Sequence, residues 1–183
     1  IESMQIIQDQ AVLAQLPPSM AQRVLSSVAR SQLLGTPNPA VNDVLLYWDF
    51  DEMEFLARVV DDETPKVQLP QVPSPILRDY NWPSMFSTVM AHQKTTASFL
   101  SLRRRAFCFN QQGTAKTASA VWAADYLMHL GKIKRVLVVC PMSVMYTAWQ
   151  ADIMQTAMHR SVGVAYGTPD KRKKVMANKY DFT

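Results

Sequence analysis

The stretch "FNQQGTAKTASAVW", residues 109–122, holds the side chains of this sequence that are best suited to chemistry. A short turn, "NQQGTA", leads to Lys116 and Thr117. Phosphate-binding loops have this order: backbone N–H groups curl around the phosphates at a helix N-terminus, a lysine reaches the β and γ phosphates, and the next hydroxyl helps to hold Mg²⁺. We therefore predict a nucleotide site made by Gln112, Gly113, Thr114, Ala115, Lys116 and Thr117.

One residue of this loop departs from the usual pattern. Ala115 occupies the place of the glycine in the common G-K-[ST] ending, where a side chain restricts the backbone or crowds the phosphate. If φ at Ala115 is negative, the methyl group is accommodated with modest loss. If φ is positive, strain of about 1–3 kcal/mol is expected. In either case we interpret the loop as a genuine phosphate cradle in a variant form.

The surrounding elements must place this loop between a strand and a helix. An apolar run at 106–110 predicts the strand, and a helical pattern from Lys116 ends at Gly131. Strands that alternate with helices of 10 to 15 residues indicate an α/β fold with a parallel sheet. The other expected elements are a helix at 84–102, strands at 135–140, 161–167 and 180–183, and helices within 141–158 and 168–179.

The first third of the chain has a different pattern and carries no residues suited to chemistry. Residues 1–60 are expected to form a small, mainly helical accessory region, with one helix from Met20 to Leu33, a strand at "VLLYW" and a second helix at "DEMEFLARVV". Residues 61–83 contain five prolines and read as a linker. The main domain is expected to begin at residue 84 and to be incomplete at the last residue.

Composition and charge limit the class of protein. With 48% apolar and 19% charged residues, the chain of 183 residues is typical of a globular protein, and no apolar run approaches the roughly 20 residues that span a bilayer. We expect no membrane association and an intracellular, cytoplasmic location. Cys108 and Cys140 lie in apolar runs and are expected to be buried thiols without metal-ligand spacing.

The charge is divided unevenly along the chain. Residues 1–70 hold four Lys or Arg against ten Asp or Glu, whereas residues 71–183 hold fifteen against five. A basic half favours a polyanionic partner such as nucleic acid. The clusters at 103–105 and 171–174 are equally compatible with an ordinary solvated surface.

Three stretches in this order resemble the first motor lobe of the Snf2-like superfamily 2 DNA helicases and translocases, especially the compact phage and bacterial versions: "AHQKTTASFL", "RAFCFNQQGTAKTASAVWAADYL" and "KIKRVLVVCPMSVMYTAW". The resemblance covers about residues 73–183 and implies a partial RecA-like P-loop domain. It implies that Gln93 recognises adenine and that "QGTAKT" is the Walker A loop. It also implies that Pro141, Met142 and Ser143 contact the nucleic-acid backbone as motif Ia.

The resemblance implies an ATP-dependent helicase with hydrolase activity, using ATP and Mg²⁺ and binding double-stranded DNA by its backbone. Lys116 and Thr117 would be its catalytic residues, with Thr117 on the Mg²⁺ bound to ATP. If the protein is phage-encoded, it would act in the host cytoplasm. No acidic D-E-x-H pair follows Lys116 in this sequence. We therefore expect this chain alone to bind ATP and to hydrolyse it slowly or not at all.

Two other functions stay open. The first is a non-hydrolysing nucleotide-binding interaction module, in which the acidic residues 1–60 recruit a protein partner. The second is a small-molecule kinase, which would need an arginine-bearing lid and a substrate acid that the sequence does not place.

Overall fold

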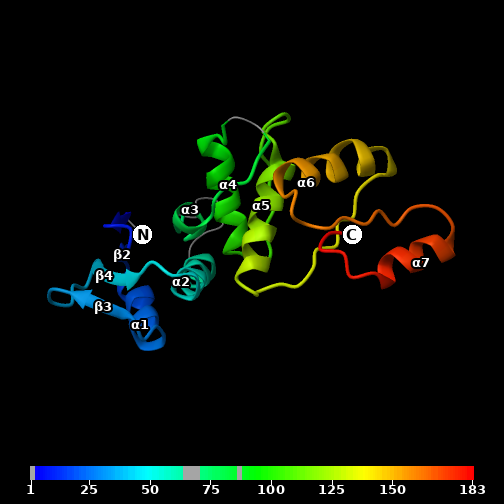
Figure 1. Cartoon of the computed structure of the whole chain (residues 1–183). Coiled ribbons are helices and arrows are strands. Elements are labelled where there is room, and N and C mark those ends of the chain that lie inside the picture. Colours follow the sequence, from blue (N-terminus) through cyan, green and yellow to red (C-terminus); the bar gives the residue numbers. More distant parts are fainter. Residues whose placement is uncertain (1–2, 64–70, 86–87) are drawn as a thin grey trace. The chain divides into compact units, whose positions relative to one another are not determined.

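The computed structural model describes residues 3–63, 71–85 and 88–183 (Figure 1). By backbone contacts the chain divides into two compact units. The first, unit 1, comprises Ile1–Asp79 and Ser98–Ala106, and the second, unit 2, comprises Tyr80–Ala97 and Phe107–Thr183. The division therefore falls inside helix α4 (Ala91–Ser101).

Unit 1 is built on an antiparallel sheet of four strands in the order β1-β2-β4-β3. The strands are β1 (Met4–Ile7), β2 (Ala11–Leu16), β3 (Ser31–Leu34) and β4 (Asn42–Tyr47). Helix α1 (Pro18–Ser27) joins β2 to β3, α2 (Phe50–Glu63) follows β4, and the short helix α3 (Ile76–Asp79) comes later.

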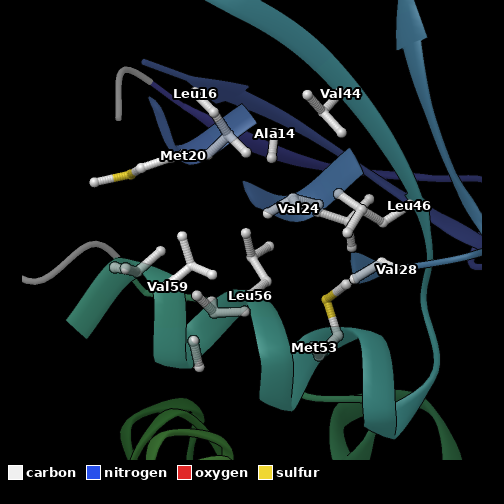
Figure 2. Packing of buried hydrophobic residues seen from close by; sticks show 14 of the residues in the cluster. Ala14, Leu16, Met20, Val24, Val28, Val44, Leu46, Met53, Leu56 and Val59 are labelled. Carbon is white, nitrogen blue, oxygen red and sulfur yellow. The ribbon is translucent and has the colours of Figure 1, made fainter. Parts of the chain in front are cut away.

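The core of unit 1 lies between one face of this sheet and its helices. Burial alternates along β2 and β4, as expected for strands that are covered on one face. Figure 2 shows Leu16 and Leu46 of the sheet directed toward the helix that carries Met53, Leu56 and Val59. Leu56 is fully buried. Replacing a buried leucine by alanine typically lowers the free energy of unfolding by about 2–5 kcal/mol, so Leu56 stabilises unit 1 by a similar amount.

The prediction of a mainly helical region is wrong, because residues 4–47 contain the four strands. The predicted strand "VLLYW" overlaps β4, and the predicted helix "DEMEFLARVV" lies within α2. The first predicted helix is too long: α1 ends at Ser27, and Leu33 lies in β3, paired with Val44. Cross-strand pairing with β4 has overridden the helical periodicity of that segment.

The segment predicted to be a linker is divided between the two units where the structure describes it: residues 71–79 belong to unit 1, and residues 80–83 belong to unit 2. Val72, Ser74 and Ile76 are buried. The Ser74 N–H donates to Ser98 Oγ at 3.0 Å, and Trp48 Nε1 donates to the carbonyl of Pro73 at 2.9 Å. Residues 64–70, which hold two of the prolines, lie outside the described residues.

Ion pairs take up much of the acidity of unit 1. Arg23 pairs with Asp62 and Glu63, Arg30 with Asp49 and Glu52, and Arg104 with Glu54. Arg103 pairs with Asp61 at 3.0 Å while its guanidinium stacks over the Phe99 ring. Arg103 is therefore a buried structural residue, and the cluster at 103–105 is only partly a solvated surface.

Unit 2 is organised around α5 (Lys116–His129), which is followed by a 3-10 turn (Met142–Val144), a π-helical turn (Met145–Gln150), α6 (Ala151–Thr156) and α7 (Pro169–Ala177). A helix lies within each of the segments expected at 84–102, 116–130, 141–158 and 168–179, as α4, α5, α6 and α7. The first prediction begins too early, since α4 starts at Ala91 and residues 84, 85 and 88–90 are not helical; residues 86–87 lie outside the described residues. The C-terminus of α5 closes as predicted: Gly131 has φ +69° and donates to the Met128 carbonyl.

The parallel sheet is present only as two isolated bridges in the described part of unit 2. Phe182 pairs in parallel with Val136 and with Val162. The Val136 and Gly163 N–H groups donate to Asp181 and Phe182 carbonyls at 2.8 and 2.9 Å. The three chain segments thus run side by side in the expected direction. A parallel RecA-like sheet is not observed, and the fold shown is mixed α/β.

The predicted strands of unit 2 are also less buried than their sequences indicate. Residues 106–110 form no strand, and Phe107 and Phe109 stack on each other while exposing 82% and 88% of their surface. At 135–140 one face packs on Val121 and Ile153, whereas Leu137 and Val139 are exposed. The two cysteines are free and half-buried, not buried. No helix among the described residues is long and apolar enough to cross a membrane.

Candidate nucleotide site

The loop of residues 110–117, called here the candidate loop, leads directly into α5, whose first residue is Lys116. Gly113 has φ +80°, and Ala115 is left-handed at φ 51° and ψ 46°. Two of the three residues 113–115 therefore have a positive φ angle. Such reversals point successive N–H groups to one side and form a concave surface that binds anions.

The N–H groups of this loop are free to bind a ligand. In the part of the chain that the structure describes, no backbone N–H from Gln112 to Thr117 donates a hydrogen bond to another protein group. The last of these belong to the first turn of α5, where intrahelical partners are lacking and the helix dipole is positive. The geometry therefore combines a curled backbone, orphan donors and a helix N-terminus.

The left-handed backbone at Ala115 decides between the two alternatives that the sequence left open. The φ angle is positive, so the strained alternative holds. Glycine would adopt this conformation freely, whereas the Cβ of alanine disfavours it. Ala115 itself is exposed, so its methyl group is not forced against a packed neighbour.

Lys116 turns back over the candidate loop. Its ammonium donates to the carbonyl oxygens of Asn110 and Gln111 at 2.9 and 2.8 Å. The Thr114 hydroxyl also donates to Gln111, at 2.8 Å. The positive charge is thus held beside the free N–H groups by weak neutral acceptors, which an anionic oxygen can replace with a stronger charge-assisted bond.

Thr117 has an acidic neighbour that the sequence did not identify. The carboxylate of Asp152 faces it from α6, the helix that packs against α5 through Ile153 and Val121. Burial raises the pKa of Asp152, and the nearby Thr117 hydroxyl opposes this effect. Only packing between two helices 35 residues apart in sequence brings the pair together, so no local pattern could have revealed it.

A hydroxyl and a carboxylate oxygen are ligands that suit Mg²⁺. Thr117 and Asp152 therefore fit the role of holding a magnesium ion that is bound mainly by nucleotide phosphates. Within the described ranges no group of three or more His, Cys, Asp or Glu side chains is placed to hold a metal ion. The phosphates would have to supply the remaining ligands.

Gln93 lies in the first turn of α4. Its Oε1 accepts a hydrogen bond from the Met90 N–H at 2.9 Å, which caps the helix. One turn later, Thr96 Oγ1 accepts from Asn110 Nδ2 at 2.8 Å and so ties α4 to the start of the candidate loop. The amide nitrogen of Gln93 keeps no protein partner among the described residues.

Pro141, Met142 and Ser143 are all exposed at the 3-10 turn that precedes α6. The Ser143 side chain makes no cap, although its carbonyl accepts a hydrogen bond from Thr147. No hydrogen bond in the described chain joins this turn to the candidate loop. The structure thus ties α4, the helix that carries Gln93, to the start of the candidate loop through Thr96, and leaves the turn as a separate exposed surface.

A second network missed from the sequence surrounds Asp125, a buried carboxylate of α5. Its oxygens accept from Tyr80 at 2.5 Å and Arg160 at 2.6 Å, and His159 Nε2 lies 3.0 Å away. Burial alone would raise the pKa of Asp125, but the hydrogen bonds from Tyr80, Arg160 and His159 lower it overall. Burial and the bond to Asp125 raise the pKa of Tyr80 far above its usual value. This network joins the start of unit 2 and the segment after α6 to α5.

Comparison with known proteins adds no assignment to this geometry. No family model matches the chain, and no curated protein is similar enough to count as a match.

Proposed function

We propose that this chain is the N-terminal part of an ATP-dependent DNA helicase or translocase, and that unit 2 is its ATP-binding lobe. The observation that carries the proposal is the candidate loop: free N–H groups curl at the start of α5 with the Lys116 ammonium held beside them. This is the arrangement that binds the phosphates of a nucleotide.

Each predicted residue has a role in this proposal. The N–H groups of Gln112 to Thr117 bind phosphate oxygens, and Lys116 neutralises their charge. Thr117 holds Mg²⁺, with Asp152 against its hydroxyl. Gln93 reads adenine, since its amide nitrogen is free and α4 is tied to the loop by Asn110. The exposed turn at Pro141–Ser143 binds a nucleic-acid backbone.

Binding without rapid turnover is the expected behaviour of this chain. Hydrolysis requires a carboxylate pair that positions water, together with a stabilising arginine from a second lobe. Beside Thr117 only one carboxylate, that of Asp152, is found in the described residues. A turnover near one per second by the chain alone would contradict this account.

The proposal is tested by titrating the chain with a fluorescent ATP analogue in the presence of Mg²⁺. Replacing Lys116 by alanine should weaken binding by about 10- to 150-fold, because hydrogen bonds to charged groups contribute about 1.5–3 kcal/mol. Lys134→Ala is the matched control: Lys134 is an exposed lysine of the same unit, and this change should leave the affinity unchanged. Equal affinities of the Lys116→Ala variant and the unaltered chain would overturn the proposal.

A non-hydrolysing interaction module is the second candidate, favoured by the single carboxylate near Thr117. Recruitment of a partner by charge has less support, since most acids of α2 already bind arginines of unit 1. A longer chain that hydrolyses ATP faster when DNA is added would exclude the module.

A further inference from the structure

Helix α7, drawn in red in Figure 1, carries four consecutive basic residues. Lys171, Arg172, Lys173 and Lys174 are all exposed, and in the described part of the molecule none of them makes an ion pair. The helix carries one acid, Asp170, in its first turn. Four adjacent positive charges without compensation attract a polyanion.

Two exposed aromatic rings adjoin this helix. Tyr166 precedes it and lies against Tyr146 of the π-helical turn, with ring centroids 6.4 Å apart and planes at 88°. The two residues expose 52% and 50% of their surface, so each ring leaves much of its area to solvent. Tyrosine rings exposed beside positive charge offer surfaces on which unpaired bases stack.

The chain turns tightly between the tyrosines and the helix. Gly167 has φ +101°, and the aliphatic stem of Lys171 lies 3.5 Å from the place where a Cβ on Gly167 would stand. The stem of the first lysine of α7 thus packs beside Gly167, the residue that follows Tyr166. Tyr146 in turn follows the exposed turn at Pro141–Ser143 by three residues. The ring contact of Tyr146 with Tyr166 and the packing of Lys171 on Gly167 therefore bring the two tyrosines close to the start of α7.

We propose that Tyr146, Tyr166 and the basic residues of α7 bind a single strand of nucleic acid. Lys171 and Lys174 contact phosphates, and the tyrosines stack with unpaired bases. This inference rests on the proposed function only for the choice of nucleic acid as the kind of partner. The surface itself shares no residue with the candidate loop, so binding at the two can be measured separately.

A membrane surface fits these residues less well. Helices that lie on membranes need a broad apolar face beside their basic face. In α7 the apolar residues are only Val175, Met176 and Ala177, at its last turn, after the four basic residues. Because α7 is basic and lacks an apolar face, a polyanion dissolved in water is a better partner for it than a membrane surface.

Helix geometry sets the number of phosphates reached. Residues three apart lie on the same face, so Lys171 and Lys174 point the same way, while Lys173 lies on another side. Two contacts by Lys171 and Lys174 would contribute about 1.4 to the slope of log K against log salt for a single strand, at roughly 0.7 per phosphate.

The test measures binding of the full chain to a fluorescent oligothymidine by anisotropy at several salt concentrations, without ATP. The double variant Lys171→Gln/Lys174→Gln should lower the salt slope by about 1.4. The control Lys134→Gln/Arg135→Gln removes the same charge from exposed positions elsewhere in unit 2 and should change the slope little. An equal fall in both variants would mean unspecific attraction and would overturn the proposal.

The tyrosines are tested in the same assay. Tyr166→Ala should weaken binding by roughly 5- to 150-fold, the range that corresponds to about 1–3 kcal/mol per stacked base, and Tyr166→Phe should retain it. Circular dichroism of each variant confirms folding. Equal binding of Tyr166→Ala, tighter binding to blunt duplex, or binding to phosphatidylserine vesicles alone would each refute the assignment. Lys116→Ala should bind the strand normally, which separates this result from failure of the ATP site.

Discussion

Ala115→Gly is the most direct test of the candidate loop. Alanine is held there at φ 51°, in the left-handed region. The substitution removes one exposed methyl group and leaves the hydrogen bonds of Lys116 to Asn110 and Gln111 in place. Any change in stability therefore reports the backbone conformation rather than packing.

The expected magnitude follows from two opposing effects. A left-handed backbone costs an ordinary L-residue about 1–2 kcal/mol, and glycine escapes this cost. Glycine loses about 0.5–1 kcal/mol more conformational entropy on folding than alanine does. The net result is a stabilisation of about 0.5–1 kcal/mol, or a melting temperature raised by roughly 1–4 °C in a chain of this size.

Ala120→Gly provides the matched control, because Ala120 lies within α5, in an ordinary helical conformation. There only the entropic cost applies, so this variant should lose about 0.5–1 kcal/mol. The two free energies of unfolding, measured by urea denaturation, should thus change in opposite directions. If Ala115→Gly destabilises the chain as much as Ala120→Gly does, the left-handed assignment is refuted.

Nucleotide affinity gives an independent reading of the same variant. If Ala115 has the left-handed conformation both with and without nucleotide, the strain is equal in the two states and cancels in the binding free energy. ATP should bind Ala115→Gly within about twofold of the unaltered chain. A tenfold gain, equal to about 1.4 kcal/mol, would mean that the free loop in solution adopts another conformation.

Three further predictions concern stability. Asp125→Asn should cost unit 2 about 1–3 kcal/mol in urea denaturation, because Arg160 would lose its nearer charged partner and keep only Asp181, at 3.6 Å. Because the fold lowers the pKa of Asp125, this carboxylate stabilises unit 2 above the unfolded pKa near 3.9, and the stabilisation is lost as pH falls below that value. Acid titration followed by tryptophan fluorescence should show this loss of stability. Asp125→Asn should make the acid-induced loss smaller. Leu56→Ala should cost unit 1 about 2–5 kcal/mol without changing ATP affinity, and a loss of binding would contradict the separate cores.

The sequence was most informative where the structure depends on local pattern. The helical pattern from Lys116 and the glycine after it predict α5 and its end closely, and "TPDKRKKVMANK" predicts α7. Both segments combine periodicity with recognisable termini. By contrast, β3 has apolar residues at helical spacing, and only its pairing with β4 makes it a strand.

The sequence was least informative about contacts between distant segments. Asp152 reaches Thr117, and Arg160 reaches Asp125, through packing that no spacing rule encodes. The apolar run at 106–110 illustrates the opposite error. Its composition predicts a buried strand, yet Phe107 and Phe109 are exposed, because apolar composition shows that a segment can be covered and not that it is covered.

The geometry of the candidate loop is set by groups outside it. Asn110 is fixed to α4 through Thr96, and Thr117 lies in the first turn of α5. The six residues between them are thus held at both ends by helices, and Ala115 takes the left-handed conformation that an isolated peptide would avoid. A backbone fixed by such contacts loses less entropy on binding phosphate than a flexible loop would. The strain at Ala115 is therefore better explained as a consequence of preorganisation than as damage to the site.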